Sequence, residues 1–359
     1  MQHRGIESTE RCIVHSAPTG TPCTEANHPL ILQSCANEPL VDCLGSGSVA
    51  TYMGRRIIPN TPTEILGARQ AAAVAREATR RAGRPGMHIN DVATPITAQG
   101  KMAAIDTEMG LRPSDAFLVS QMVELKTDYD QLSRVPHMQS VGMHIVDLLT
   151  PLIGGMGGGA AGTAVVTVAE HLLGTVCYDA SYHIYGHMGL MSVNNTDRMG
   201  LWIYSLGGQA LTRNTPILMI DAIYCRSGPG TTDLLWEVAA GSVATTVSGL
   251  HQGGVGCTGG TDTDVYTGLE ARFNAQVCHA ALGMTREEAN GYVLEFLSRY
   301  ESKLADPDRG RPFDELYDTD LIEPTDEWLD IFEGVSEEIT ALGLDMDRGW
   351  RTALQGAHQ

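Results

Sequence analysis

The chain has 359 residues, of which 43% are hydrophobic, and it carries 43 acidic against 24 basic residues, for a net charge of −19. Phosphate contacts require a basic surface, so this charge argues against nucleic-acid binding. The length suits a single (β/α)₈ barrel, a fold that takes about 250 residues and can carry more.

The cysteines and the N-terminal segment point to a reducing compartment. The eight cysteines include no CxxC pair, so a zinc ribbon or thioredoxin motif is not indicated. Several lie in apolar runs, as small buried side chains do, and we expect a cytoplasmic protein without disulfides. The opening MQHRGIESTE lacks the apolar core of a secretory signal. No run of 18 apolar residues is uninterrupted, so no membrane span is expected.

Short apolar runs, each followed by Gly, Pro, Ser, Thr or His, predict buried strands that end in loops. Eight such runs cover residues 12–16, 41–45, 86–90, 132–137, 151–155, 175–181, 218–225 and 245–250. Helix-like stretches lie between most of them. The clearest spans residues 62–81, with Thr61 as its N-cap and Gly83 beyond its end. Strands that alternate with helices predict a parallel sheet, and eight of them predict a closed (β/α)₈ barrel.

The C-terminal part is predicted to be helical. Thr285 and Glu288 have the spacing of a capping box at the start of one helix, and a last helix is predicted over residues 326–342. The chain shows no linker of the kind that separates domains. We therefore expect a single barrel domain over residues 1–359, with the helices of residues 285–345 packed on its periphery.

Residues 82–100, AGRPGMHINDVATPITAQG, have the pattern of a barrel strand that ends at a site. Gly83 and Pro85 form a turn, a short buried strand runs to Asn90, and a polar loop follows through Thr94 and Thr97. Active sites of this fold lie at the carboxyl ends of the strands, so Asn90 is predicted to face the site.

This segment resembles the active-site strand of the pyrrolysine-containing monomethylamine methyltransferases. Further matched stretches follow in the same order at near-constant spacing: APTG at 17–20, ELK at 124–126, GP at 228–229, TGLEAR at 267–272, YD at 317–318, PT at 324–325 and LGL at 342–344. The resemblance covers most of residues 11–345. It implies a (β/α)₈ barrel that assembles as a homo-oligomer and hands a methyl group from an amine to the cobalt of a partner corrinoid protein.

The sequence departs from that family at three positions that act together, the pyrrolysine position and the two positions that contact pyrrolysine. Asn90 stands where the family has pyrrolysine, and Leu148 and Ala222 stand where it has the glutamate and glutamine that contact pyrrolysine. Pyrrolysine is thought to capture and orient the amine. A quaternary ammonium needs positioning and charge neutralisation rather than capture, so the loss indicates a change of substrate class.

The candidate site residues follow from the resemblance and from the predicted strand ends. Catalytic roles are predicted for Asn90, His137 and His183; substrate contacts for Asp147, Tyr182, Tyr185, Asp221, Tyr224 and His251; and a corrinoid approach loop for Gly154, Gly155 and Gly157. The tyrosines would form an aromatic cage around a cation, with the aspartates adding negative charge. The alternatives are ordinary barrel-wall tyrosines, buried structural histidines and simple turn glycines.

No metal site and no tightly bound cofactor are expected. The spacing of His183 and His187 suits a metal on a helix, but no carboxylate or cysteine completes a set. The leading hypothesis is therefore a pyrrolysine-independent methyltransferase that acts on a methylated, cationic amine and uses the corrinoid of a partner protein. A non-catalytic homologue that binds a small ligand or a corrinoid protein is one alternative. An acid–base lyase or isomerase on the same barrel is the other.

Overall fold

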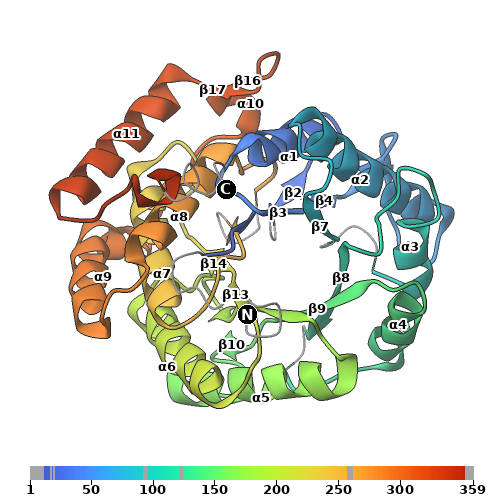
Figure 1. The fold of residues 1–359 in the computed structure, drawn as a ribbon, viewed down its shortest axis with the longest axis horizontal. Coiled ribbons are helices and arrows are strands. Elements are labelled where there is room, and N and C mark those ends of the chain that lie inside the picture. Colours follow the sequence, from blue (N-terminus) through green and yellow to red (C-terminus); the bar gives the residue numbers. More distant parts are fainter. Residues whose placement is uncertain are drawn as a thin grey trace.

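The computed structural model describes residues 12–16, 18, 21–91, 96–121, 124–256 and 262–351, so Thr94 of the predicted site loop lies outside the described residues. Parallel strands form the centre and helices surround them (Figure 1). One seven-stranded parallel sheet has the order β1 (His15–Ser16), β3 (Cys43–Gly45), β7 (His88–Asp91), β8 (Ala116–Gln121), β9 (His144–Leu149), β11 (Tyr182–Tyr185) and β13 (Met219–Asp221).

The eighth strand position is taken by residues 251–252. Ile220 of β13 pairs with His251, and Gln252 pairs with Val14 next to β1, both in parallel. These bridges join the two edges of the sheet, so the predicted (β/α)₈ barrel is confirmed.

Short strand pairs accompany the barrel strands. They are β2 (Pro22–Cys23) with β4 (Ser48–Val49), β5 (Thr51–Tyr52) with β6 (Arg55–Arg56), β10 (Leu152–Ile153) with β12 (Met188–Gly189), β14 (Ile223–Tyr224) with β15 (Val255–Gly256), and β16 (Tyr317–Asp318) with β17 (Glu323–Pro324). The β10–β12 and β14–β15 pairs continue directly beyond the carboxyl ends of barrel strands, where active sites of this fold lie.

One helix follows each barrel strand. The surrounding helices are α1 (His28–Asn37), α2 (Pro62–Arg81), α3 (Ala98–Ala103), α4 (Tyr129–Ser140), α5 (Ala160–Tyr178), α6 (Arg198–Asn214), α7 (Thr232–Val247) and α8 (Gly268–Ala281). Helix α2 has the predicted bounds. Side chains of Thr97, Asp128, Asp197 and Thr231 cap the first turns of α3, α4, α6 and α7.

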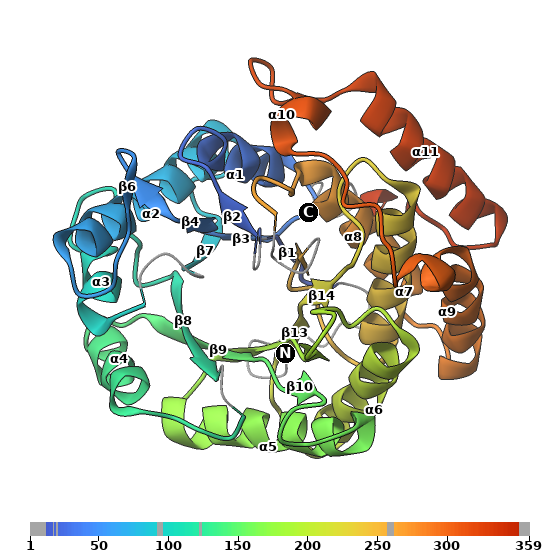
Figure 2. The ribbon, with the colours of Figure 1, turned by 180° about the vertical axis from the view of Figure 1, so that it is seen from behind.

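The remaining helices pack outside α7 and α8, as Figure 2 shows from behind. They are α9 (Arg286–Tyr300), the 3₁₀ turn η3 (Glu301–Lys303), α10 (Phe313–Leu316) and α11 (Asp326–Ala341). The predicted capping box of Thr285 and Glu288 is present at the start of α9.

Several strand predictions were wrong. Residues 132–137 lie within α4, residues 175–181 include the end of α5, and residues 245–250 include the end of α7. Each run has apolar residues that suit a helix face as well as a strand. The run 151–155 contains only the short strand β10, because the barrel strand at this place is β9, which ends before the run begins. No predicted run covers β8.

Side chains alternate along each barrel strand between an inner and an outer face. The inner apolar cluster consists of Ala116, Leu118, Val146, Leu148, Ile184, Ile220, Ala222 and Tyr224, with Tyr182 and Met188 packed against it. Outer side chains such as Ile89, Phe117, Val119 and Ile145 belong to the larger core with the helices. This alternation decides which polar residues face the barrel interior.

Helix α5 is strongly apolar, although threonines, Glu170 and His171 interrupt its apolar run. Among the described residues, α5 is long and apolar enough to cross a membrane by length and composition alone. It packs against β9, β11 and α6 as one helix of the barrel wall. Only 33% of its apolar window is buried, so much of its apolar surface faces outward.

Candidate active site

Asn90 lies inside the barrel near the carboxyl end of β7. It is paired in register with Ala116 of the inner cluster, and paired residues of parallel strands point to the same face. Its side chain is 0% exposed, and neither Nδ2 nor Oδ1 has a hydrogen-bond partner among the residues that the structure describes. A buried amide without partners is rare in folded proteins and marks a place where a ligand or water completes the bonding.

The next residue of β7 holds Asn90 in this orientation. Asp91 points outward and accepts hydrogen bonds from Lys101 Nζ at 2.7 Å and Ser46 Oγ at 3.0 Å. Both partners of the Lys101–Asp91 ion pair are 2% exposed. Breaking a buried pair leaves an uncompensated charge, so the strand is fixed in this register.

The described inner cluster on the same face as Asn90 contains no charged side chain. Leu148 and Ala222, the two residues that replace polar residues of the family, belong to the inner cluster together with Tyr224. A Cβ on Gly186 would lie 3.2 Å from the Tyr224 ring, so this glycine makes room for the ring. Burial raises the pKa of the Tyr224 hydroxyl, which stays neutral. The wall therefore offers apolar surface and the aromatic face of Tyr224.

Tyr182 also lies inside the barrel, but at the amino end of β11. Its hydroxyl is 3.1 Å from Nε2 of His88, which stands two residues before Asn90 on β7. Strands β7 and β11 are separated by β8 and β9 in the sheet, so this bond crosses the barrel interior. His88 was not among the predicted site residues, although strand alternation places it on the same face as Asn90.

Two predicted site residues, His183 and Asp147, face outward beneath α5 instead. Oδ2 of Asp147 accepts a hydrogen bond from Gln121 Nε2 at 2.7 Å and lies 3.3 Å from His183 Nδ1. The His183 ring stacks on His171 of α5. Burial lowers the pKa of His183 to about 4 and raises that of Asp147. The expectation that these two face the barrel mouth is wrong.

Tyr185 and Asp221 likewise point toward the helices. The Tyr185 hydroxyl donates to the carbonyl of Ile203 in α6 at 2.7 Å. Asp221 accepts from Thr245 Oγ1 at 2.5 Å and from the Gly253 amide at 2.8 Å, and burial raises its pKa to about 7. The aromatic cage with added carboxylates that was predicted from the sequence therefore loses these members, because odd and even positions of a strand face opposite sides.

His137 and His251 were both expected at strand ends. His137 lies on α4, outside the sheet, so its predicted place beside Asn90 is wrong. His251 lies in the eighth strand position, is 6% exposed and accepts a hydrogen bond from the Ile13 amide at 3.1 Å. This hydrogen bond connects the eighth strand position to the segment before β1.

The conformation and close packing of the loop explain several of the glycines in residues 154–159. Glu124 accepts hydrogen bonds from the amides of Leu152 at 2.9 Å and Met156 at 2.8 Å, and a Cβ on Gly155 would collide with its carboxylate. A Cβ on Gly157 would meet the backbone of α5, and Gly154 has a φ of +95°. The predicted role of Gly154, Gly155 and Gly157 toward a corrinoid remains a prediction.

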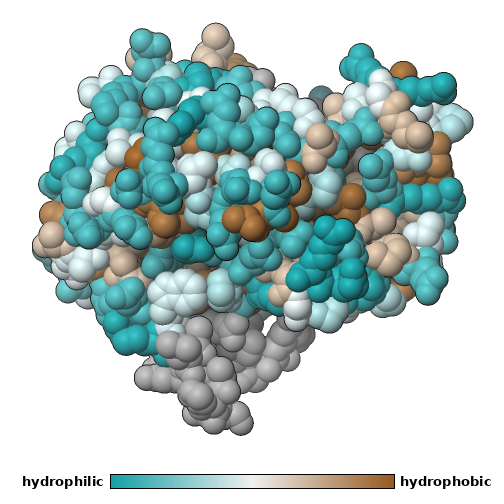
Figure 3. All heavy atoms as spheres, turned by 90° about the horizontal axis from the view of Figure 1, so that it is seen from above, coloured by the Kyte–Doolittle hydropathy of each residue, from teal (hydrophilic) through white to brown (hydrophobic). Residues whose placement is uncertain are grey.

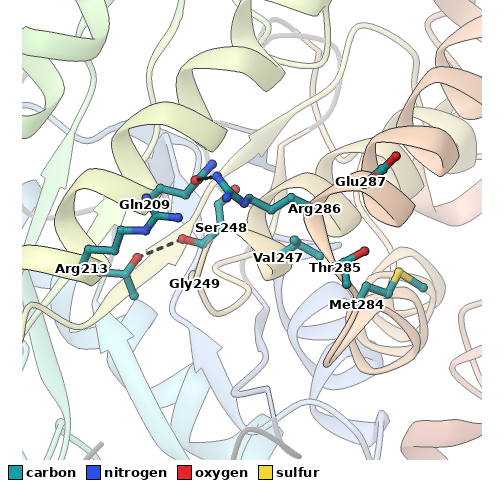
Figure 4. A pocket seen from close by; sticks show the side chains of 10 residues that line it. Gln209, Arg213, Val247, Ser248, Gly249, Met284, Thr285, Arg286 and Glu287 are labelled. Carbon is teal, nitrogen blue, oxygen red and sulfur yellow. Dashed lines mark hydrogen bonds between the residues drawn. The ribbon is translucent and has the colours of Figure 1, made fainter.

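Within the described ranges, no group of three or more His, Cys, Asp or Glu side chains is arranged to hold a metal ion. A surface pocket of about 540 Å³ lies between the ends of α6 and α7 and the start of α9 (Figure 4). There Arg286 donates to Gln209, and Thr212 donates to the Ser248 carbonyl. No barrel-strand residue lines this pocket, so it is not the candidate active site.

The fold and the buried, unpaired side chain of Asn90 define a (β/α)₈-barrel protein with its candidate site near the carboxyl ends of the strands. More narrowly, the chain belongs to the monomethylamine methyltransferase family. The family model described as "Monomethylamine methyltransferase MtmB" matches residues 1–344.

Individual relatives agree with this assignment. The chain is 32% identical over 345 residues to monomethylamine methyltransferase MtmB2 of Methanosarcina barkeri, covering 96% of this chain and 75% of that protein. It shows the same identity and coverage with monomethylamine methyltransferase MtmB of Methanosarcina mazei. The crystal structure of Methanosarcina barkeri MtmB superposes with a TM-score of 0.89 at 31% identity, covering 94% of this chain and 74% of that one. The relatives are thus named methyltransferases throughout.

Proposed function

We propose that this protein transfers a methyl group from a methylated, cationic amine to the cobalt of a corrinoid carried by a partner protein, without pyrrolysine. The observation that carries the proposal is the amide of Asn90, which is buried inside the barrel and whose two polar atoms have no partner within the described part of the chain. It occupies the strand position at which the resemblance sets the catalytic residue of the family. A ligand in the barrel would supply the missing partner.

The apolar character of the wall favours a substrate that leaves without needing a proton. When the methyl group moves to cobalt, the C–N bond breaks and its electron pair stays on nitrogen. A quaternary ammonium then departs as a neutral tertiary amine. The positive charge disappears in this step, and surroundings of low polarity favour the loss of charge.

The outward orientation of Asp147 and Asp221 changes how the cation would be held. The inward groups that remain include Oδ1 of Asn90, which can point at an ammonium, the ring of Tyr224, and the bonded pair of His88 and Tyr182 toward the amino ends of the strands. A tyrosine face near a cation contributes about 0.5–2 kcal/mol. We therefore assign orientation of the substrate to Asn90 and recognition of its charge to Tyr224.

The test measures methyl transfer to reduced cobalt directly. The purified chain is incubated anaerobically with free cob(I)alamin and, in parallel, with a purified corrinoid protein. Mono-, di- and trimethylamine, tetramethylammonium and choline are offered one at a time. The visible spectrum reports methylation of cobalt. We expect turnover with a quaternary ammonium and none with monomethylamine.

Two results would contradict the proposal in different ways. Turnover with monomethylamine alone would retain the reaction but refute the change of substrate class. Binding of a quaternary ammonium by calorimetry, without methylation of either acceptor, would instead identify a non-catalytic binding homologue.

A further inference from the structure

His15 of β1 is a second buried side chain of the barrel with a polar atom that lacks a partner. It is 2% exposed, and its Nδ1 lies 2.6 Å from the carbonyl oxygen of Gly253. A carbonyl oxygen only accepts hydrogen bonds, so Nδ1 carries the proton and donates. Burial lowers the pKa of His15 to about 4, so the ring is neutral and Nε2 keeps a lone pair. No partner for Nε2 is present among the described residues.

His15 faces the interior of the barrel. Its two neighbours on the strand face the helices instead, since Val14 belongs to the larger core and Ser16 Oγ lies 3.1 Å from the hydroxyl of Tyr266. Successive residues of a strand point to opposite faces, so the His15 ring lies on the inner face, as Asn90 does.

The register of the strands sets His15 and Asn90 in one layer of that interior. Alternate strands of this fold contribute the four side chains of a layer, and neighbouring strands are staggered by about one residue. His15 pairs through β3 with His88, and the stagger across two strands raises the level from His88 to Asn90. The same step repeated around the sheet gives Val146 and Ile220 and then returns to His15 through the bridges of residues 251–252.

The layer thus has an apolar half and a polar half. Val146 and Ile220 belong to the inner apolar cluster, whereas His15 and Asn90 are adjacent in the layer and both have unpaired polar atoms in the described part of the chain. The strand between them is β3, where Gly45 pairs in register with Asn90. Gly45 has no side chain, so β3 leaves space between the two polar groups on the side toward the mouth.

The outer surface gives a weaker indication of a ligand than this layer does. The face over α1, α2 and α11 is mainly hydrophilic, and its hydrophobic residues lie in small separate groups (Figure 3). Scattered apolar residues are normal on a protein surface. Two buried polar groups without partners, side by side, mark a place where a ligand or a water completes the bonding.

We propose that the methylated ammonium substrate carries a hydroxyl group, which donates to Nε2 of His15 and accepts from Nδ2 of Asn90. A hydroxyl does both with one oxygen atom, whereas a carboxylate only accepts and a protonated amine only donates. The inference rests on the proposed function for the ammonium end of the substrate and adds the group at its other end.

The two ends of such a substrate lie at different depths in the barrel. Leu148 and Ala222 lie one layer nearer the mouth than His15, and Tyr224 lies beyond them. One layer corresponds to about 5–7 Å along the strands, a distance that a short alkyl linker spans. The hydroxyl anchors the deep end, and the methyl groups of the ammonium face the mouth, where the proposed reaction requires the corrinoid to approach.

The test measures binding by calorimetry with ligands that differ in one group. Choline is compared with n-propyltrimethylammonium, in which a methyl group replaces the hydroxyl. Choline should bind about 10- to 100-fold more tightly to the natural protein, because the analogue leaves the buried imidazole and amide without a partner. Equal affinities would overturn the inference and would mean that an ordered water occupies the position.

Two variants locate the contact with the hydroxyl. His15→Asn keeps a side-chain donor for the Gly253 carbonyl but removes the acceptor at Nε2, so the preference for choline should fall at least about fivefold. Val146→Ala is the matched control, since it changes the same layer without removing a polar group and should leave the preference unchanged. A preference that survives in His15→Asn would overturn the assignment of His15. Circular dichroism checks that both variants are folded.

A neutral alcohol and the cobalt assay separate this inference from the proposed function. The affinity for 3,3-dimethylbutan-1-ol, which has the hydroxyl but no charge, should fall in His15→Asn by the same factor as that for choline. Preferred binding of choline without methylation of cobalt would refute the methyl transfer and leave the role of His15 intact. Equal methyl transfer from choline and n-propyltrimethylammonium would support the transfer and overturn the role of His15.

Discussion

Nδ1 of His183 lies 3.3 Å from Oδ2 of Asp147, on the outer side of the barrel sheet beneath α5. The two residues are neighbours in register on β11 and β9. Gly174 of α5 lies against this pair, and a Cβ there would collide with the Asp147 carboxylate. The pair therefore belongs to the packing between the sheet and its helices.

Replacing Gly174 tests this assignment. Gly174→Ala should destabilise the protein by about 1–3 kcal/mol because the added methyl group displaces Asp147 in a close-packed layer. Gly334→Ala in α11 is the control. A Cβ there meets nothing within 4 Å, so alanine should stabilise the helix by about 0.5–1 kcal/mol. Urea denaturation measures both, and equal effects would contradict the packing around Asp147.

The barrel and its helices α2 and α9 were predictable, but of the barrel strands only β1, β3, β7 and β13 overlap the predicted runs. Thr61 and Thr285 marked helix starts correctly because signals at a helix start are local: Thr285 caps α9 with its side chain, and Thr61 precedes Pro62 at the first position of α2. The run 132–137 was misassigned because its apolar residues also suit a helix that Asp128 caps. The strand β8 was missed because an apolar run buried on both faces resembles a buried helix segment in sequence.

The site was only partly predictable for a related reason. Strands buried on both faces do not alternate polar and apolar residues, so the sequence does not show which of two neighbours faces inward. Asn90 was placed correctly inside the barrel. His183 and Tyr182 were both chosen, and only Tyr182 faces inward, while Tyr185 and Asp221 face the helices.

Asn90 and Asn195 allow a ligand-facing amide to be compared with a structural one. Asn90→Ala removes a buried group that has no partner among the described residues, so the free energy of unfolding should change by less than about 1 kcal/mol while methyl transfer is lost. Nδ2 of Asn195 donates to the carbonyls of His187 and Ala222, and its Oδ1 accepts from the Tyr224 amide. Asn195→Ala should therefore cost about 2–4 kcal/mol.

Denaturation and activity are measured on the same preparations of both variants. A large loss of stability for Asn90→Ala would mean that its amide is bonded within the folded protein. Unchanged methyl transfer would remove Asn90 from the site.

Buried neutral histidines should make the protein sensitive to acid. Burial lowers the pKa of His171 to about 3 and that of His183 to about 4, from 6.5. Their contribution to stability is complete above pH 6.5 and is lost as the pH falls toward these values, since the unfolded chain takes up the protons first. Each histidine contributes a slope of up to about 1.4 kcal/mol per pH unit.

The expected result is a free energy of unfolding that falls between pH 6.5 and pH 4, as measured by urea denaturation at several pH values. In His171→Gln the free energy of unfolding should fall less steeply with pH. The slope should decrease by up to about 1.4 kcal/mol per pH unit, the effect of one proton, because one buried neutral histidine is removed. Parallel curves for the natural protein and the variant would show that His171 is protonated in the folded state.

Tyr224 and Tyr185 distinguish recognition of a cation from packing. Tyr224 belongs to the inner cluster, whereas the Tyr185 hydroxyl is bonded to the Ile203 carbonyl on the outer side. Tyr224→Leu should weaken the binding of choline by about 1–2 kcal/mol, a roughly 5- to 30-fold rise in Kd, because the aromatic face is lost. Binding of 3,3-dimethylbutan-1-ol, a neutral molecule of the same shape, should change much less.

Calorimetry on the two variants with both ligands separates the explanations. Tyr185→Phe removes the hydroxyl beneath α6 and should lower stability by about 1 kcal/mol without altering either affinity. If Tyr224→Leu weakened the binding of choline and of the neutral alcohol equally, the ring would act by packing alone. The cationic substrate would then lose its main support, while the assignment of Asn90 would stand on its own test. A loss confined to choline would locate the positive charge against Tyr224 inside the barrel.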